Sequence, residues 1–218
     1  MVDTRISQLT DLGSSVDDAT DEIPIVDSSA GQTKKIFPSD LKGNDKVVGT
    51  QDIWLPAGAW ISKTTAGAAA IAQTESSSET HNLSHFDFDT STVEYINHTL
   101  VLPRNYNNST ITFTPYWTAA SGSGGVVWEL KAVSLSDSDA IDTAVGTGQT
   151  STDTLLTALD VHIAPESSAI TIAGTPASQD LIILELSRKT GDASDTLGVD
   201  AKFLGAMIKI SITKGTST

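Results

Sequence analysis

The chain of 218 residues carries 27 acidic and 13 basic side chains, which gives a formal net charge of −14 at pH 7. This charge repels DNA and anionic membrane surfaces, so we expect no nucleic acid and no lipid bilayer as a partner. The chain contains no cysteine, which excludes disulfides, thiolate nucleophiles and cysteine-based zinc sites.

The N-terminal segment is acidic and poor in apolar residues. The first 33 residues hold seven acidic side chains and one basic side chain, a composition that does not build a core of its own. Within it, residues 23–27 and 34–37 are predicted as two short strands around a turn. Because a lone hairpin is marginally stable in water, we expect residues 1–45 to form an extended arm that orders against a partner chain. Residues 46–51 are expected to be a linker.

Regular β patterning begins at about Asp52. In residues 110–117 apolar side chains alternate with threonines, which predicts a half-buried strand. Residues 126–132 alternate in the same way, with charged side chains on the outer face. A Gly- and Ser-rich stretch, residues 119–125, separates the two runs, so we predict that they pair as a hairpin.

The remaining pattern completes an all-β prediction. Further strands are predicted near residues 60–62, 86–88, 98–102, 159–163, 169–172, 180–187 and 202–213. Residues 152–160 are compatible with either two helical turns or a strand. Many short strands separated by turn residues indicate a jelly-roll-like antiparallel β-sandwich over residues 52–218, preceded by the extended N-terminal arm and its short β-hairpin.

Two candidate metal sites occur in the sequence, and each lacks a part. His81 and His85 have the i, i+4 spacing of a helical zinc pair, but Asn82 stands where a metalloprotease has its general-base glutamate. We therefore interpret both histidines as solvated loop residues. Residues 137–142 contain three aspartates, which suits calcium, but not the glycine and final glutamate of an EF-hand loop. We expect a solvated acidic loop there and no metal or other cofactor.

Catalytic motifs are also incomplete. The sequence has no nucleophile elbow and no Walker A loop. A glycan-cleaving site needs only two facing carboxylates, and 27 acidic residues supply such a pair by chance. Aromatic sugar platforms are scarce, because aromatic residues make up 6% of the chain. We therefore expect a protein that is not an enzyme.

The large aromatic residues fall mostly in predicted strands. Phe113, Trp117 and Trp128 are expected to pack in the core or in a subunit interface. Trp54 and Trp60 lie near the start of the predicted sandwich. We expect them to seal its base or to form a subunit contact.

Segments throughout the chain resemble bacteriophage proteins. The arm resembles the N-terminal segment of phage fibre and appendage proteins in the runs Ile6–Leu9, Asp21–Asp27 and Thr33–Leu41. The remainder resembles the β-sandwich modules of phage structural proteins in the runs Trp60–Gly67, Tyr116–Gly122 and Asp195–Lys202. The resemblance covers nearly the whole chain. It implies a virion appendage protein, a tail or head fibre or spike, whose arm attaches it to the particle.

The resemblance also implies attachment residues, an assembly and a location. The attachment residues are apolar and basic side chains of the arm: Ile6, Leu9, Ile23, Ile25, Lys34, Lys35, Ile36, Phe37 and Leu41. A homotrimer agrees with the physics, since a weak hairpin gains stability by packing around a symmetry axis. The sequence shows no signal-peptide pattern and no apolar run of roughly 20 residues. We therefore expect a protein made in the host cytoplasm and carried in the virion.

These inferences give a leading hypothesis and two alternatives. The leading hypothesis is a fibre or spike subunit that is anchored by residues 1–45 and displays residues 52–218, whose loops bind a host glycan or protein. Its partners are then copies of itself, other virion proteins and a host receptor. One alternative is a capsid decoration (cement) protein whose arm braces neighbouring subunits on the shell. The other, from a different class, is a polysaccharide-degrading enzyme.

Overall fold

The chain forms two units, which are described separately. The computed structural model describes three ranges of the chain: residues 23–27, 32–36 and 47–214. One unit is Met1–Val47 with Thr216–Thr218, and the other is Val48–Gly215. In the first unit, β1 (Ile23–Asp27) pairs antiparallel with β2 (Gln32–Ile36). This pairing confirms the predicted hairpin.

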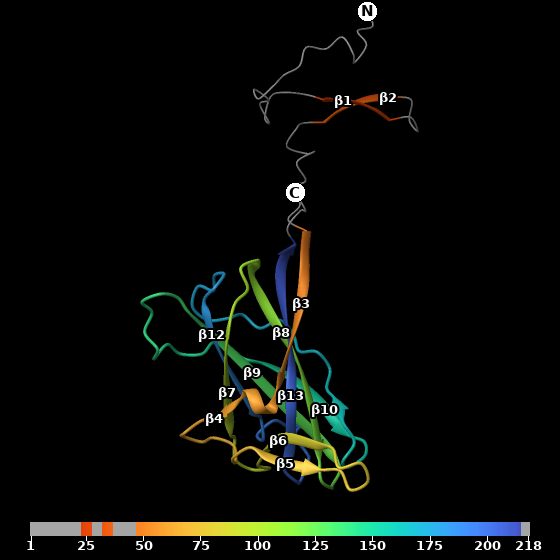
Figure 1. The fold of residues 1–218 in the computed structure, drawn as a ribbon, viewed down its shortest axis with the longest axis vertical. Coiled ribbons are helices and arrows are strands. Elements are labelled where there is room, and N and C mark those ends of the chain that lie inside the picture. Colours follow the sequence, from red (N-terminus) through yellow and green to blue (C-terminus); the bar gives the residue numbers. More distant parts are fainter. Residues whose placement is uncertain (1–22, 28–31, 37–46, 215–218) are drawn as a thin grey trace, which may run out of the picture. The chain divides into compact units, whose positions relative to one another are not determined.

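The second unit contains two antiparallel sheets (Figure 1). The sheet that we call the β8 sheet has the spatial order β11 (His162–Ile163), β8 (Tyr106–Ala119), β13 (Ala201–Lys214), β6 (Asn82–Phe88) and β5 (Ala72–Glu75). The β9 sheet has the order β10 (Gln149–Leu155), β9 (Gly124–Leu135), β12 (Leu181–Arg188), β7 (Tyr95–Val101) and β4 (Ile61–Ser62). In addition, β3 (Val47–Pro56) pairs with β13 and leads into the 3-10 turn η2 (Ala57–Ala59).

The core fills the space between the two sheets. Phe113 and Trp117 of β8 and Trp128 of β9 are all fully buried. The ring of Trp128 lies 5.6 Å from that of Phe203 on β13 and 5.2 Å from that of Phe88 on β6. Because every second residue of each strand faces inward, the alternation read from the sequence becomes the core of a sandwich. This arrangement confirms the predicted all-β, jelly-roll-like fold class.

The predicted hairpin between residues 110–117 and 126–132 is wrong. β8 and β9 are consecutive in the chain, but β8 pairs with β13 and β11, whereas β9 pairs with β12 and β10. The connection between them crosses from one sheet to the other; Gly122 within it and Gly124 at the start of β9 have positive φ. Both strands carry large apolar side chains, which are buried when the strands face each other across the core. If the strands paired edge to edge in one sheet, their apolar faces would lie on the same side of that sheet and could not bury each other.

The strand bounds decide one open alternative and correct two predictions. Of residues 152–160, which the sequence leaves as helix or strand, those up to Leu155 lie in β10, because its Thr-rich run pairs with β9 along its whole length, and the rest form turns. Residues 169–172 form only single bridges, such as that between Ile111 and Ile170. Residues 47–51, expected in the linker, lie in β3. Among the described residues, no helix has the length and apolar character that a membrane span requires.

A buried ion pair fastens the segment after β12 to the sandwich. The side chains of Arg188 and Asp195 are 0% and 1% exposed, and Nη2 of Arg188 donates to Oδ1 of Asp195 at 2.8 Å. The guanidinium also donates to the backbone carbonyls of Phe88, Leu197 and Val199. Its charge and its donors are therefore satisfied inside the protein, which makes this burial tolerable.

Candidate functional site

Two aromatic rings meet on the outer face of the β8 sheet. Trp54 of β3 is 44% exposed, and its ring meets that of Tyr116 on β8 edge to face, with centroids 4.8 Å apart. Gly205 of β13 pairs with Tyr116, and a Cβ added to it would stand 2.6 Å from Cη2 of Trp54. The backbone φ of Gly205, 152°, also disfavours other residues. Glycine at this position therefore lets the indole lie over β13.

A hollow of about 430 Å³ opens beside these rings. Besides Trp54 and Tyr116, its lining includes the apolar side chains of Leu83, Val161 and Leu204. Leu83 and Val161 are exposed to solvent. Aromatic rings with open apolar surroundings provide a stacking surface for a ligand that has an apolar face. We call this space the aromatic hollow.

A second hollow of about 600 Å³ adjoins the first, because Leu83 and Leu204 line both. Its lining includes side chains with hydrogen-bonding groups, among them Thr118 of β8, Lys202 of β13 and His85 of β6. We call it the polar hollow, and the two hollows together the groove. The volume of each hollow falls within the roughly 300–1,000 Å³ of typical ligand sites.

Strand register explains why the polar side chains come together. Lys202 pairs with Thr118 on one side and with Asp87 on the other, so the three residues form a row across the outer face. Nζ of Lys202 lies 3.0 Å from Oδ1 of Asp87. His85 lies two residues from Asp87 on the same strand, and its Nε2 lies 2.9 Å from Oγ1 of Thr74. Residues from four strands therefore converge beside this hollow.

The imidazole of His85 is buried and uncharged. Burial lowers the pKa of His85 below its usual value of 6.5, and the charge of Lys202 lowers it further, against the opposing effect of Asp87. Nδ1 of His85 lies 2.9 Å from Oδ1 of Asp87. The ring is therefore neutral at pH 7 and is held between Thr74 and Asp87.

The structure buries four of the five aromatic residues that the sequence singled out and exposes the fifth. Trp60, Phe113, Trp117 and Trp128 are buried in the core, and the ring of Trp60 lies 5.6 Å from that of Phe203. Trp54 alone among these five faces solvent. Sequence reasoning grouped it with Trp60 because the two lie close together in the chain.

The arm residues give no site in the described part of the chain. Ile23 and Ile25 lie in β1, and Lys34, Lys35 and Ile36 lie in β2. The other predicted attachment residues fall outside the described residues: Ile6, Leu9, Phe37 and Leu41. Attachment by the arm therefore stays a prediction.

The sequence interpretation missed most residues of the groove. Tyr116 and Thr118 lie on the outward-facing side of β8, whereas the sequence prediction singled out only the apolar residues that face inward. His85 was interpreted as a solvated loop residue, which is wrong, because it lies in β6 and is 2% exposed. The sequence does contain an indication, because Phe86 and Phe88 alternate as in a strand and this pattern continues back to His85.

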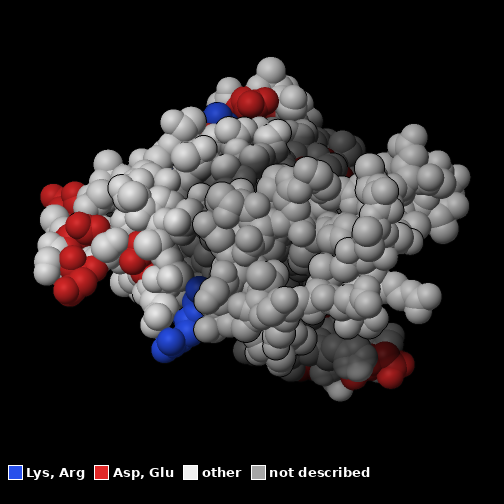
Figure 2. All heavy atoms as spheres, turned by 90° about the horizontal axis from the view of Figure 1, so that it is seen from above, with Lys and Arg blue, Asp and Glu red and all other residues white. Residues whose placement is uncertain are grey.

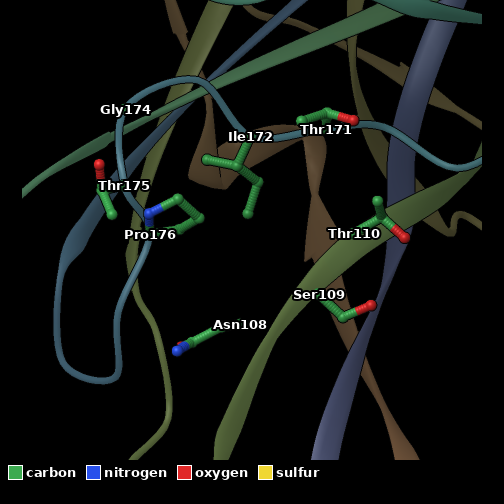
Figure 3. A pocket seen from close by; sticks show the side chains of 8 residues that line it. All are labelled: Asn108, Ser109, Thr110, Thr171, Ile172, Gly174, Thr175 and Pro176. Carbon is green, nitrogen blue, oxygen red and sulfur yellow. The ribbon is translucent and has the colours of Figure 1, made fainter.

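Two other candidates lack the features of a site. Oδ2 of Asp139 accepts the backbone N–H of Ser136, and within the described ranges no three His, Asp or Glu side chains gather as metal ligands. A hollow of about 520 Å³ lies between the start of β8 and the loop 171–176 (Figure 3). It is lined by Asn108, Ser109, Thr110, Thr171, Ile172, Gly174, Thr175 and Pro176, so it holds neither an ionisable group nor an aromatic ring.

Comparisons with known proteins give no family. No protein-family model and no curated protein matches the sequence. Among solved structures, TmCBM61 in complex with β-1,4-galactotriose is similar at 17% identity over 70% of this chain and 89% of that chain, with a TM-score of 0.34. The CBM22-2 xylan-binding domain of Paenibacillus barcinonensis Xyn10C is similar at 10% identity over 72% and 98%, with a TM-score of 0.44.

A third similar structure is the family 11 carbohydrate-binding module of Clostridium thermocellum in complex with a β-1,3-1,4-mixed-linked tetrasaccharide. It shares 12% identity over 73% of this chain and 94% of that chain, with a TM-score of 0.38. Similarity of this degree does not assign a ligand to this chain.

Proposed function

We propose that this chain is a non-enzymatic structural subunit of a bacteriophage particle, a fibre or spike protein whose β-sandwich binds a glycan on the host surface. The observation that carries the binding role is the groove. It places the exposed ring of Trp54 next to a polar hollow on the same sheet face.

This combination matches the chemistry of a sugar. A pyranose ring has C–H groups on its faces and hydroxyl groups around its edge. The C–H groups pack on the electron-rich face of an aromatic ring, as Trp54 and Tyr116 provide. The hydroxyls need a donor or acceptor at the side, as the Thr118 hydroxyl provides. The groove therefore offers both kinds of contact within one site.

The groove is suited to binding and not to cleavage. A glycosidase uses two carboxyl groups that face each other across the scissile bond. Among the described residues that line the two hollows, only Glu75 has a carboxylate. Asp87, beside the polar hollow, is engaged by Lys202 at 3.0 Å. This arrangement supports an adhesin over a polysaccharide-degrading enzyme.

The virion role rests on the arm. Residues 1–45 are acidic, resemble phage attachment segments and include the β1–β2 hairpin. Because an isolated hairpin gains stability from a partner surface, an arm of this kind suits docking to a larger assembly. Figure 2 shows acidic side chains over more of the drawn face than basic ones, which suits a surface that stays in solution.

Labelling of purified particles tests the virion role. Antibodies raised against the full chain are applied to phage particles whose genome encodes it, and the particles are viewed by electron microscopy. We expect label on fibres or spikes that project from the particle. Label spread evenly over the capsid would indicate a decoration protein, and particles without label would contradict the proposal.

A further inference from the structure

The polar hollow contains a buried polar atom without a hydrogen-bond partner. Oγ1 of Thr118 is buried and unpaired, and the residue is 8% exposed and lines the hollow. A buried polar group without a partner is costly, and most are paired in native proteins. An unpaired hydroxyl in the lining of a hollow indicates that its partner comes from outside the chain.

Strand geometry places this hydroxyl beside the aromatic rings. Tyr116 and Thr118 are two residues apart on β8, which is roughly 6.6–6.8 Å along a strand. This distance is comparable to the length of one pyranose ring. A sugar residue stacked on Trp54 therefore has its neighbour in the polar hollow, where the neighbour's hydroxyls meet Thr118.

The charges of the polar hollow disfavour an anionic ligand. Lys202 is the only Lys or Arg among the described residues that line it, and Asp87 already neutralises its charge. His85 is uncharged, and Glu75 adds a negative charge to the lining. The net charge of the whole chain is −14. A carboxylate or sulfate on a sugar would find repulsion there and no free cation.

We propose that the groove binds a neutral glycan of at least two sugar residues, one stacked on Trp54 and the next hydrogen-bonded to Thr118. This assignment rests on the proposed glycan-binding function and names the ligand class of that site.

Thr118→Val tests the polar contact, with Thr114→Val as its matched control. Both residues lie on the outer face of β8, but Thr114 lines neither hollow. Thr118→Val removes an unpaired hydroxyl and keeps the side-chain shape, so the fold should be at least as stable as the wild type. Loss of one hydrogen bond to the ligand should weaken binding about three- to tenfold.

The probe is the surface polysaccharide of the host, separated by anion exchange into a neutral and an acidic fraction, and binding to the full-length chain is measured by affinity electrophoresis. We expect binding to the neutral fraction, loss of binding in Trp54→Ala, weaker binding in Thr118→Val and no change in Thr114→Val. Binding to the acidic fraction alone would overturn the ligand class. Wild-type binding by Thr118→Val would overturn the polar contact, whereas binding to neither fraction would overturn the proposed function itself.

Discussion

Removing the carboxylate of Asp195 tests how the sandwich holds the segment after β12. Asp195→Ala leaves the guanidinium of Arg188 charged, because arginine does not deprotonate in proteins. Nε and Nη2 of Arg188 lose their carboxylate partner, and the backbone N–H of Val127 loses its acceptor at 3.0 Å. Since the Arg188 side chain is 0% exposed, water does not replace the lost bonds without local opening.

The expected loss is large. Breaking a buried ion pair by removing one partner costs about 3–5 kcal/mol. For a domain of this size that corresponds to a fall in Tm of about 6–20 °C. Asp142→Ala is the matched control, because Asp142 is exposed in a loop, and it should change stability by at most about 0.5 kcal/mol.

Thermal unfolding followed by circular dichroism measures both variants. Replacing the pair together, as Arg188→Met with Asp195→Leu, removes the uncompensated charge but also the donor to the Phe88, Leu197 and Val199 carbonyls, so it should recover only part of the loss. A fall in Tm for Asp195→Ala no larger than that for Asp142→Ala would refute the inference that this pair holds the segment.

Three further predictions concern the groove and the assembly. Because folding lowers the pKa of His85 below 6.5, the unfolded chain binds more protons in mild acid, so the unfolding free energy should fall from pH 6.5 toward about pH 5. Urea titrations should show a smaller fall in His85→Gln; an equal fall would contradict this. Gly205→Ala should displace the Trp54 ring, lower stability by about 1–3 kcal/mol and red-shift tryptophan fluorescence, whereas unchanged fluorescence would contradict the packing. Light scattering should give three times the chain mass of 22.8 kDa, and a monomer would contradict the trimer.

Much of the fold is readable from local patterns. The alternation in residues 110–117 and 202–213 predicted strands, and the structure has β8 and β13 there, each with its apolar side chains in the core. Partner choice was not readable, because β8 pairs with β13 and β9 with β12, which lie far away in the chain. Burying the apolar faces of both strands between the two sheets contributes more free energy than pairing the strands across their short connection would.

The groove was less accessible to sequence reasoning than the core. Trp54, Tyr116 and Thr118 lie in two strands that are far apart in the chain, and they meet only because β3 pairs with β13 beside β8. Nothing in the sequence marks Gly205 as part of a site, yet its lack of a side chain leaves the space that the indole of Trp54 occupies. Sites that form across strands depend on register and on pairing, which a single sequence specifies weakly.

The most direct test of the account is to incubate the full-length chain with surface polysaccharide isolated from the host, and to measure both retention and new reducing ends. We predict that the chain is retained, that no new reducing ends form, and that Trp54→Ala is no longer retained. New reducing ends would contradict the account by identifying an enzyme. A wild-type chain that is not retained would contradict the glycan-binding role of the groove.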